Sequence, residues 1–337
     1  MKKTVLPILT FFAMPAMADV PKVVTDIAPV HGLAARVMQG VGTPDLIVPP
    51  GASPHDFALR PSQARGLEQA DLVLWMGPDL APWMDRVLDV LADAEALDLN
   101  ALPGTQILEF RDDEEFGDHD HDHGEDHAED AHDDHDEHEH DEDEHEEHEE
   151  HEEHEENTGH DGHDHGPNDP HSWLSPANAK YWVTVIAENL AARDPENADI
   201  YSANATAAAT EIDAAVEYAE AKLTPHHDAP FLVFHDAYHY FEAAFDLHTV
   251  GTVAEGDAAA PGPGRIRDLQ NRIAAEGVLC LFSEPQFETG LIETLAESTD
   301  AEIGVLDPLG SKLDLGPDFY PTLITSMADV ISECLAK

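Results

Sequence analysis

The sequence predicts an α/β protein of two lobes, each with a mostly parallel four-stranded sheet, joined by one long rigid helix. Three observations support this prediction. The chain has 337 residues, which is more than one hydrophobic core usually supports. Short apolar runs alternate with helix-like stretches in both halves of the chain. Between the halves lies a long Ala-rich stretch without internal Gly or Pro.

The first half reads as β-α-β-α-β-α-β. Its short apolar runs predict strands at residues 22–27, 45–48, 70–76 and 96–99. The intervening stretches predict helices at residues 30–38, 61–69 and 80–91. After residue 230 the pattern returns, with strands expected at residues 231–234, 247–253, 278–283 and 303–306 and a last helix at residues 319–335. Such alternation is typical of parallel sheets.

Residues 195–223 predict the connecting helix. Their apolar side chains recur at roughly helical spacing, for example at Ile212, Val216, Ala219 and Leu223. At about 1.5 Å per residue this helix would extend about 40 Å and would limit hinging between the lobes. We therefore expect a first lobe at residues 19–193, a linker helix at 194–223 and a second lobe at 224–337.

Residues 1–18 resemble a bacterial export signal. Lys2 and Lys3 precede a mostly apolar stretch, and Ala16 and Ala18 offer a small-residue cleavage site. That stretch is too short to span a bilayer, and no Cys follows it to carry a lipid. We expect a free periplasmic protein that begins at Asp19.

Only two cysteines occur, Cys280 and Cys334. Export would place them in an oxidising compartment, which favours a disulfide. Two separate buried thiols are the alternative interpretation.

Residues 112–166 form a strongly acidic insert with 15 His, 30 Asp or Glu, and no Lys or Arg. A segment of this composition buries too little apolar surface to fold, so we expect disorder. His-rich tracts also indicate metal binding, which would be weak here because it must order the loop. The candidate auxiliary ligands are His119, His121, His123, His163 and His165, with further regularly spaced imidazoles at His145, His148, His151 and His154.

The net charge of −55 argues against nucleic acid as a partner, because phosphate contacts need Lys and Arg. A protein this acidic attracts cations instead.

Four residues that can bind a metal stand at or near the carboxyl ends of predicted strands, where parallel α/β sheets bind ligands. His55 follows the second strand, His235 directly follows the strand at 231–234, and Asp307 directly follows the strand at 303–306. His171 stands where the chain re-enters the first lobe after the insert. Three imidazoles and one carboxylate would make a tetrahedral zinc site in the cleft between the lobes.

Five phrases resemble, in order, the signatures of cluster A-I metal-binding proteins of ABC importers, specifically the ZnuA-type zinc members. These phrases are PGASPHDFALRPS, NDPHSWLSP, FHDAYHYFE, FSEPQF and VLDPLG. The resemblance covers nearly all of the expected mature chain. It implies a monomeric solute-binding protein that captures Zn²⁺ and delivers it to a permease in the inner membrane.

Carried over to this sequence, the zinc histidines of the family fall on His55, His171 and His235, and its carboxylate falls on Asp307. The paired cysteines of the family fall on Cys280 and Cys334. The resemblance also places a His-rich loop between the same two motifs in zinc members, whereas manganese members generally lack it.

This chain departs from the family pattern at one position, which concerns the fourth ligand. Some zinc members carry Glu directly before the first histidine, but this chain has Pro54. Either Asp307 or a water must therefore complete the site. Manganese members typically carry a carboxylate at the position of His235, and imidazole there favours zinc over the harder ion.

Other histidines are weaker candidates. His31 could face the cleft, although a histidine at a helix start is favoured, and metal contact by His226, His227 or His248 is disfavoured. His235 and His239 superficially mimic the H-E-x-x-H motif of zinc proteases. That motif requires both histidines on one helix, whereas His235 is expected directly after a strand.

Three functional classes remain open after this sequence reading. A binding protein that supplies a permease is favoured, of zinc or alternatively of manganese type. A zinc buffer or metallochaperone would work mainly through the insert. A hydrolytic enzyme would need a substrate pocket and a general base, and the sequence indicates neither, so we expect no enzyme.

Overall fold

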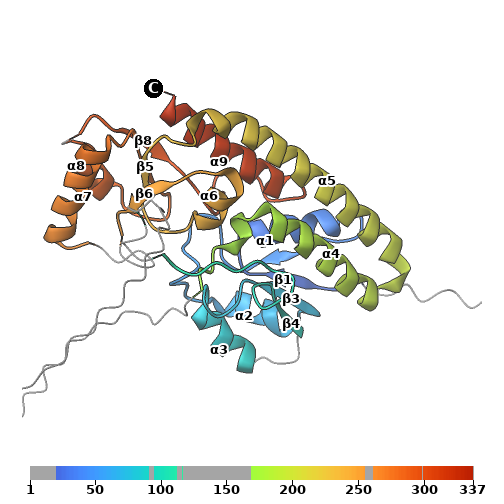
Figure 1. Cartoon of the computed structure of the whole chain (residues 1–337). Helices are drawn as coiled ribbons and strands as arrows, with labels where there is room; N and C mark the ends of the chain where they lie inside the picture. Colours follow the sequence, from blue (N-terminus) through green and yellow to red (C-terminus); the bar gives the residue numbers. More distant parts are fainter. Residues whose placement is uncertain are drawn as a thin grey trace, which may run out of the picture. The chain divides into compact units, whose positions relative to one another are not determined.

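The computed structural model of the chain describes residues 20–90, 95–111, 116, 168–254, 261–297 and 299–336. The expected export signal therefore lies outside the described residues, as does the expected insert apart from Phe116. Within these residues, eight strands form two parallel four-stranded sheets, with helices connecting the strands (Figure 1). All eight strands were predicted, and most are shorter than the apolar runs that predicted them.

The first sheet has the strand order β2-β1-β3-β4, with every pair parallel. Its strands are β1 (Val23–Thr25), β2 (Asp45–Leu46), β3 (Leu72–Trp75) and β4 (Glu95–Asp98). The central strands β1 and β3 are buried along their whole length, as expected where helices cover both faces of a parallel sheet. The connecting helices are α1 (Ala28–Val37), α2 (Pro61–Glu68) and α3 (Pro82–Val90).

The second sheet repeats this topology, with the order β6-β5-β7-β8 and parallel pairing throughout. Its strands are β5 (Phe231–Val233), β6 (Thr249–Thr252), β7 (Cys280–Ser283) and β8 (Glu302–Val305). The helices between them are α6 (His239–Phe245), α7 (Pro263–Glu276) and α8 (Gly290–Ala296). In both sheets the two central strands are therefore the first and third in chain order, β1 and β3 in one sheet and β5 and β7 in the other.

The predicted connecting helix is α5 (Ala198–Leu223), a 26-residue helix. It starts three residues later than expected because Pro195–Asn197 forms a 3₁₀ turn. The buried Asp194 before that turn accepts hydrogen bonds from Asn197 Nδ2 at 2.7 Å and from the Tyr201 hydroxyl at 2.8 Å. The chain therefore turns sharply into α5.

One long helix was not predicted from the sequence. This is α4 (Pro176–Arg193), which precedes α5 and packs along it. Its start carries two ordinary signals: Ser175 accepts a hydrogen bond from the Asn178 backbone N–H at 3.3 Å, and Pro176 occupies the first turn.

Helices α1, α4, α5 and the C-terminal α9 (Phe319–Leu335) pack against one another, and the long α5 runs along the edge of the molecule (Figure 1). One hydrophobic cluster runs through them and includes Leu33, Trp182, Ile212 and Ile324, all at most 1% exposed. The same cluster contains residues of both sheets. The described residues on both sides of the insert accordingly belong to one compact unit, and the lobe boundaries expected from sequence stay a prediction.

No helix in the described part of the chain is both long and apolar enough to cross a membrane.

The predicted disulfide is confirmed. Cys280, the first residue of β7, is bonded to Cys334 in the last turn of α9. The bond therefore ties the second sheet to the helix layer that both lobes share.

Replacing both cysteines by Ala should lower the free energy of unfolding by about 4 kcal/mol, because the bond closes a loop of 54 residues and restricts the unfolded chain. Urea unfolding of the oxidised protein and of the variant measures this difference. Equal midpoints and slopes for the two proteins would contradict it.

Candidate metal centre

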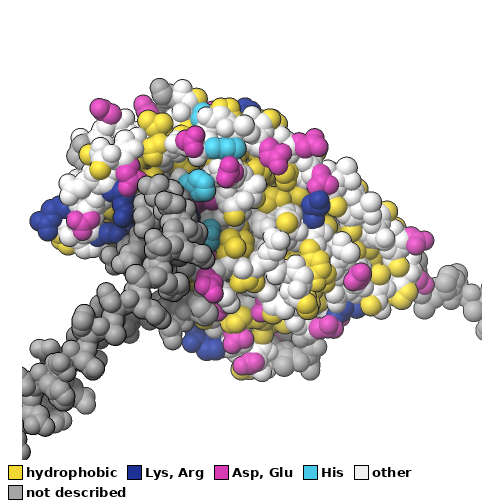
Figure 2. Space-filling view, viewed as in Figure 1, with side chains coloured by type: hydrophobic (Ala, Val, Ile, Leu, Met, Phe, Trp, Pro, Cys, Tyr) yellow, Lys and Arg dark blue, Asp and Glu magenta, His cyan; other side chains and the backbone are white. Residues whose placement is uncertain are grey.

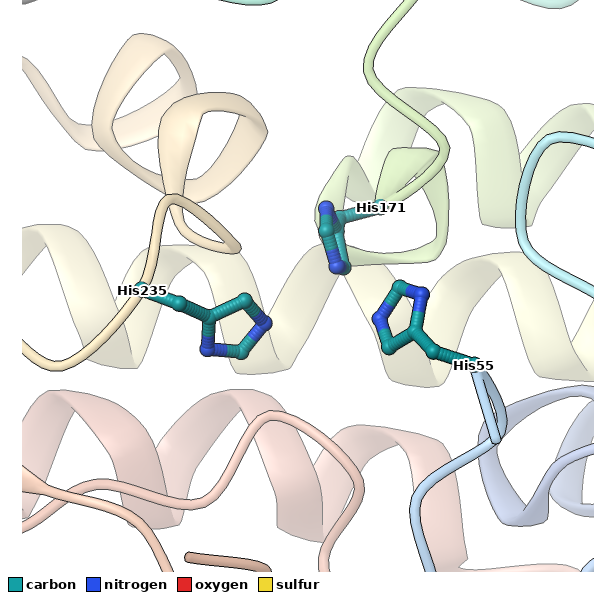
Figure 3. Close-up of side chains that lie close together, drawn as sticks. All are labelled: His55, His171 and His235. Atoms are coloured by element: carbon teal, nitrogen blue, oxygen red, sulfur yellow. The ribbon is translucent and has the colours of Figure 1, made fainter. Parts of the chain in front are cut away.

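Three imidazoles converge in the described structure, each from a different segment. His55 lies in the loop after β2, His171 directly precedes the 3₁₀ turn Ser172–Leu174, and His235 follows β5. The rings point toward one another (Figure 3), with centroid distances of 5.4 Å for His55–His171, 6.2 Å for His55–His235 and 5.2 Å for His171–His235. One nitrogen from each ring lies within 4.8 Å of the other two, so the group could hold a metal ion.

His171 is held by Asp169, which is fully buried. The carboxylate oxygen Oδ1 accepts a hydrogen bond from the His171 backbone N–H at 2.9 Å and lies 2.7 Å from His171 Nδ1. A carboxylate beside Nδ1 keeps the proton on that nitrogen and leaves Nε2 as the metal-binding atom.

His235 has the same kind of partner. Its Nδ1 lies 2.6 Å from Oε1 of the buried Glu284. Glu284 directly follows β7, the neighbour of β5 in the sheet. Two of the three histidines therefore form carboxylate–imidazole pairs, which in metal sites fix the ring orientation and raise the basicity of the ligand.

The sequence analysis missed both carboxylates. Asp169 and Glu284 stand inside the quoted phrases NDPHSWLSP and FSEPQF, but no role was assigned to them. A signal existed for Glu284, because it follows the carboxyl end of a strand as the predicted ligands do.

His55 is more exposed than the other two histidines. Its backbone N–H donates to Ser53 Oγ at 3.3 Å, and the carbonyl of the preceding Pro54 accepts a hydrogen bond from Trp83 Nε1 at 2.7 Å. Gly51, at the start of the loop, has φ +85°, a conformation that residues with a Cβ rarely adopt. The loop therefore turns at Gly51 and is tied to α3 through Trp83.

Asp307 is not in the group of three. Its Oδ2 accepts hydrogen bonds from the Ser311 backbone N–H and hydroxyl, both at 2.6 Å. Its Oδ1 accepts from Gln286 Nε2 and from the Leu309 backbone N–H, both at 3.1 Å. The carboxylate thus organises the loop after β8, and its role as fourth ligand stays a prediction.

The pocket beside the three rings is small, with a volume of about 10 Å³. That is close to the minimum that holds one water molecule. Apart from the histidines, its lining includes Trp173, Phe287, Pro308 and Leu309. A pocket of this size suits a single ion or water molecule.

Hydrogen bonds from the second lobe hold the turn that carries His171. The Tyr240 hydroxyl donates to the Asp169 carbonyl at 2.8 Å, and the Tyr320 hydroxyl donates to the Trp173 carbonyl at 2.7 Å. In the opposite direction, Trp173 Nε1 donates to the Pro308 carbonyl at 2.9 Å. These contacts attach the turn of His171 to the half of the chain that carries His235.

Tyr238 joins the loop of His235 to the end of β8. Burial, together with the negative charges of Glu284 and Asp307, raises the pKa of Tyr238 well above its usual value. The hydroxyl therefore keeps its proton and donates to the Leu306 carbonyl at 3.1 Å.

The structure places the weaker histidine candidates outside the group of three. His31 is buried in α1, where its Nε2 lies 3.1 Å from the Pro44 carbonyl and burial lowers its pKa. His226 lies near Ser332, and both His227 and His248 lie near Asp246. The candidate auxiliary ligands His119, His121, His123, His163 and His165 lie outside the described residues.

The zinc-protease interpretation fails on geometry. His239 is the first residue of α6, whereas His235 lies in the loop before that helix. The two histidines therefore do not share one helix, as the motif requires.

Comparison with known proteins identifies the family. The profile of the ZnuA family, described as zinc-uptake complex component A, periplasmic, matches residues 23–334. A high-affinity zinc uptake system protein ZnuA from Paracoccus denitrificans (strain Pd 1222) is 46% identical over 325 residues, which cover 96% of this chain and 94% of the relative. The protein of that name from Brucella suis biovar 1 (strain 1330) is 44% identical over 316 residues, covering 94% and 92%.

Solved structures agree on the fold. A crystal structure of ZnuA matches with a TM-score of 0.70 at 21% identity and covers 94% of this chain and 99% of that one. A ZnuA deletion mutant with zinc bound matches with the same score and identity. The matching profile and these relatives span nearly the whole chain, and the protein therefore belongs to the ZnuA family of zinc-uptake components.

Proposed function

We propose that this chain is a periplasmic solute-binding protein that captures Zn²⁺ between His55, His171 and His235 and delivers it to an ABC permease. The observation that carries the proposal is the convergence of three imidazole nitrogens within 4.8 Å of one another. The names of the relatives, which are high-affinity zinc uptake proteins, support zinc as the cargo.

The ligand set favours zinc on chemical grounds. Imidazole suits zinc, whereas manganese prefers carboxylate, carbonyl and water oxygens. The two carboxylates nearest the rings, Asp169 and Glu284, face Nδ1 atoms and serve as hydrogen-bond partners. A manganese-type binding protein is thus the less favoured alternative.

For the fourth ligand we favour water. The Asp307 carboxylate already accepts four hydrogen bonds, and each would be weakened if this side chain rotated toward a metal. A water in the small pocket requires no such rearrangement.

Delivery to a permease fits the other features of the chain. The expected export signal and the family description point to the periplasm, and we propose that the protein acts there as a monomer. Acidic side chains are spread over the face shown in Figure 2, which suits attraction of cations. A periplasmic zinc buffer or metallochaperone is the alternative, in which the His-rich insert would be the working part and the auxiliary low-affinity sites would carry the function.

Replacing His171 or His235 by Ala should weaken the tightest zinc site by more than about 100-fold. Loss of an outer partner already costs 10- to 100-fold, and loss of a ligand removes a metal–nitrogen bond. Competition with a chelator of known affinity measures the change. His226→Ala serves as the matched control, because it removes an imidazole outside the site and should leave the tight site unchanged.

Deletion of residues 112–166 separates the two functional alternatives. A carrier built on the three histidines keeps its tightest site after this deletion, whereas a buffer loses nearly all of its zinc. If the deletion variant with all three histidines replaced by Ala still bound one zinc ion tightly, the ligand assignment would be wrong.

Zinc affinity should fall as pH decreases through about 6.5, the usual pKa of an imidazole in water, because a protonated imidazole does not bind a metal. The insert sites should empty before the three-histidine site, since their weaker binding competes less well with protons. Zinc titrations from pH 5 to pH 8 test this order, and equal sensitivity of the strong and weak sites would contradict it.

Zinc capture should change the distance between the lobes only slightly, because α5 is continuous and the helix layer around it is one core. Small-angle scattering of the insert-deleted protein, with and without zinc, measures the radius of gyration. A change as large as that of a hinged two-lobe sugar-binding protein would refute the rigid account.

A further inference from the structure

Arg111 ends the described first-lobe segment before the insert, and its guanidinium binds two carboxylates of the second lobe. Nε donates to Asp236 Oδ2 at 3.1 Å, and a second hydrogen bond joins Nη2 to Asp236 Oδ1. Nη1 and Nη2 donate to the two oxygens of Glu242 at 2.9 and 3.0 Å. The three side chains are only 14%, 13% and 4% exposed, so this is a largely buried network of four charge-assisted hydrogen bonds.

The two carboxylates belong to segments that frame His235. Asp236 is the next residue in the chain, and Glu242 lies in α6. Glu242 Oε2 also accepts a hydrogen bond from the Thr249 backbone N–H of β6 at 3.0 Å. Arg111 therefore joins the loop of His235, the following helix and an edge strand at one point.

The segment before Arg111 is also attached to the turn of His171. The Asp169 backbone N–H donates to the Leu108 carbonyl at 2.9 Å, and the Tyr240 hydroxyl accepts from the Leu108 backbone N–H at 2.8 Å. Tyr240 in turn donates to the Asp169 carbonyl. A short stretch of the first lobe thus contacts both histidine-bearing segments.

We infer that Arg111 is a positioning residue that sets the spacing of His171 and His235 and so prepares the site for the metal. A planar guanidinium that binds two carboxylates bidentately fixes their orientation as well as their distance. Without it, Asp236 and Glu242 would face each other as buried like charges, and repulsion would displace Asp236 together with the adjacent His235. This inference rests on the proposed zinc binding by these histidines.

Arg36 provides a matched control within the same protein. Its Nε and Nη2 donate to the two oxygens of Glu211 at 2.8 and 2.9 Å, and its side chain is 11% exposed. This pair joins α1 to α5, and neither residue adjoins a histidine of the site in the chain. Glu211 is 42% exposed, so this single bidentate pair lies nearer the surface. Loss of its geometry tests the general effect of replacing a paired Arg by Lys at a place away from His235.

The test compares Arg111→Lys with Arg36→Lys in the full chain, since Lys keeps the charge but loses the bidentate geometry. Each protein receives one equivalent of Zn²⁺, and the rate of its transfer to excess chelator is followed. The absorption spectrum with one equivalent of Co²⁺ reports the geometry of the imidazole ligands. Arg111→Lys should bind zinc about tenfold more weakly, in the range of outer-partner substitutions, release it faster and alter the Co²⁺ spectrum.

Arg36→Lys should match the unsubstituted protein in both measurements. Equal effects of the two substitutions, or no effect of Arg111→Lys, would overturn the inference. A second variant covers poor folding: Arg111→Met with Asp236→Asn and Glu242→Gln removes the buried charges together with the bidentate contacts. It should still release zinc quickly, because no guanidinium then fixes the position of residue 236 beside His235, and a normal rate would overturn the inference. His235→Ala distinguishes failure of this inference from failure of the proposed function. If His235→Ala released zinc at the same rate as the unsubstituted chain, His235 would not be a ligand, whatever the effect of Arg111→Lys.

Discussion

The hydrophobic layer of α1, α4, α5 and α9 is the constraint on which the other features of the structure depend. Because one continuous cluster joins this layer to both sheets, the loops at the ends of the strands keep fixed positions relative to one another. The hydrogen bonds between Trp173 and Pro308, between Tyr320 and Trp173, and between Tyr240 and Asp169 extend this fixation to the metal centre. Three histidines from distant parts of the chain therefore meet at one place.

Bringing the three histidines together also buries charged side chains, which is unfavourable unless each of them has a partner. Asp169 and Glu284 are buried carboxylates, and each lies within hydrogen-bond distance of an imidazole that it orients. Asp236 and Glu242 are both paired with Arg111, whose pKa rises because pairing with these carboxylates outweighs the lowering effect of its burial. Buried polar groups are stable only when they are paired in this way.

The sequence predicted both parallel sheets, and it named the three histidines that the structure brings together. Alternation of apolar runs located every strand, and the stretch without Gly or Pro located α5 to within three residues at its start. Helix α4 was missed although Ser175 and Pro176 mark its start, because its apolar face is weakly periodic. Arg111 was not assigned, since pairing between residues 125 positions apart leaves no mark in local sequence. Asp169 and Glu284 were not assigned either, although Asp169 stands two residues before His171 and Glu284 directly follows a strand. Asp307 was predicted as a ligand from its position after a strand, and position alone does not reveal the four hydrogen bonds that engage its carboxylate.

The central claim is that the three histidines form the tight zinc site of this chain. Anomalous diffraction at the zinc edge, from crystals grown with one equivalent of Zn²⁺, tests it most directly. We expect one dominant peak between His55, His171 and His235, about 2.0–2.1 Å from one nitrogen of each ring. A dominant peak elsewhere in the protein, with no zinc density between these rings, would contradict it.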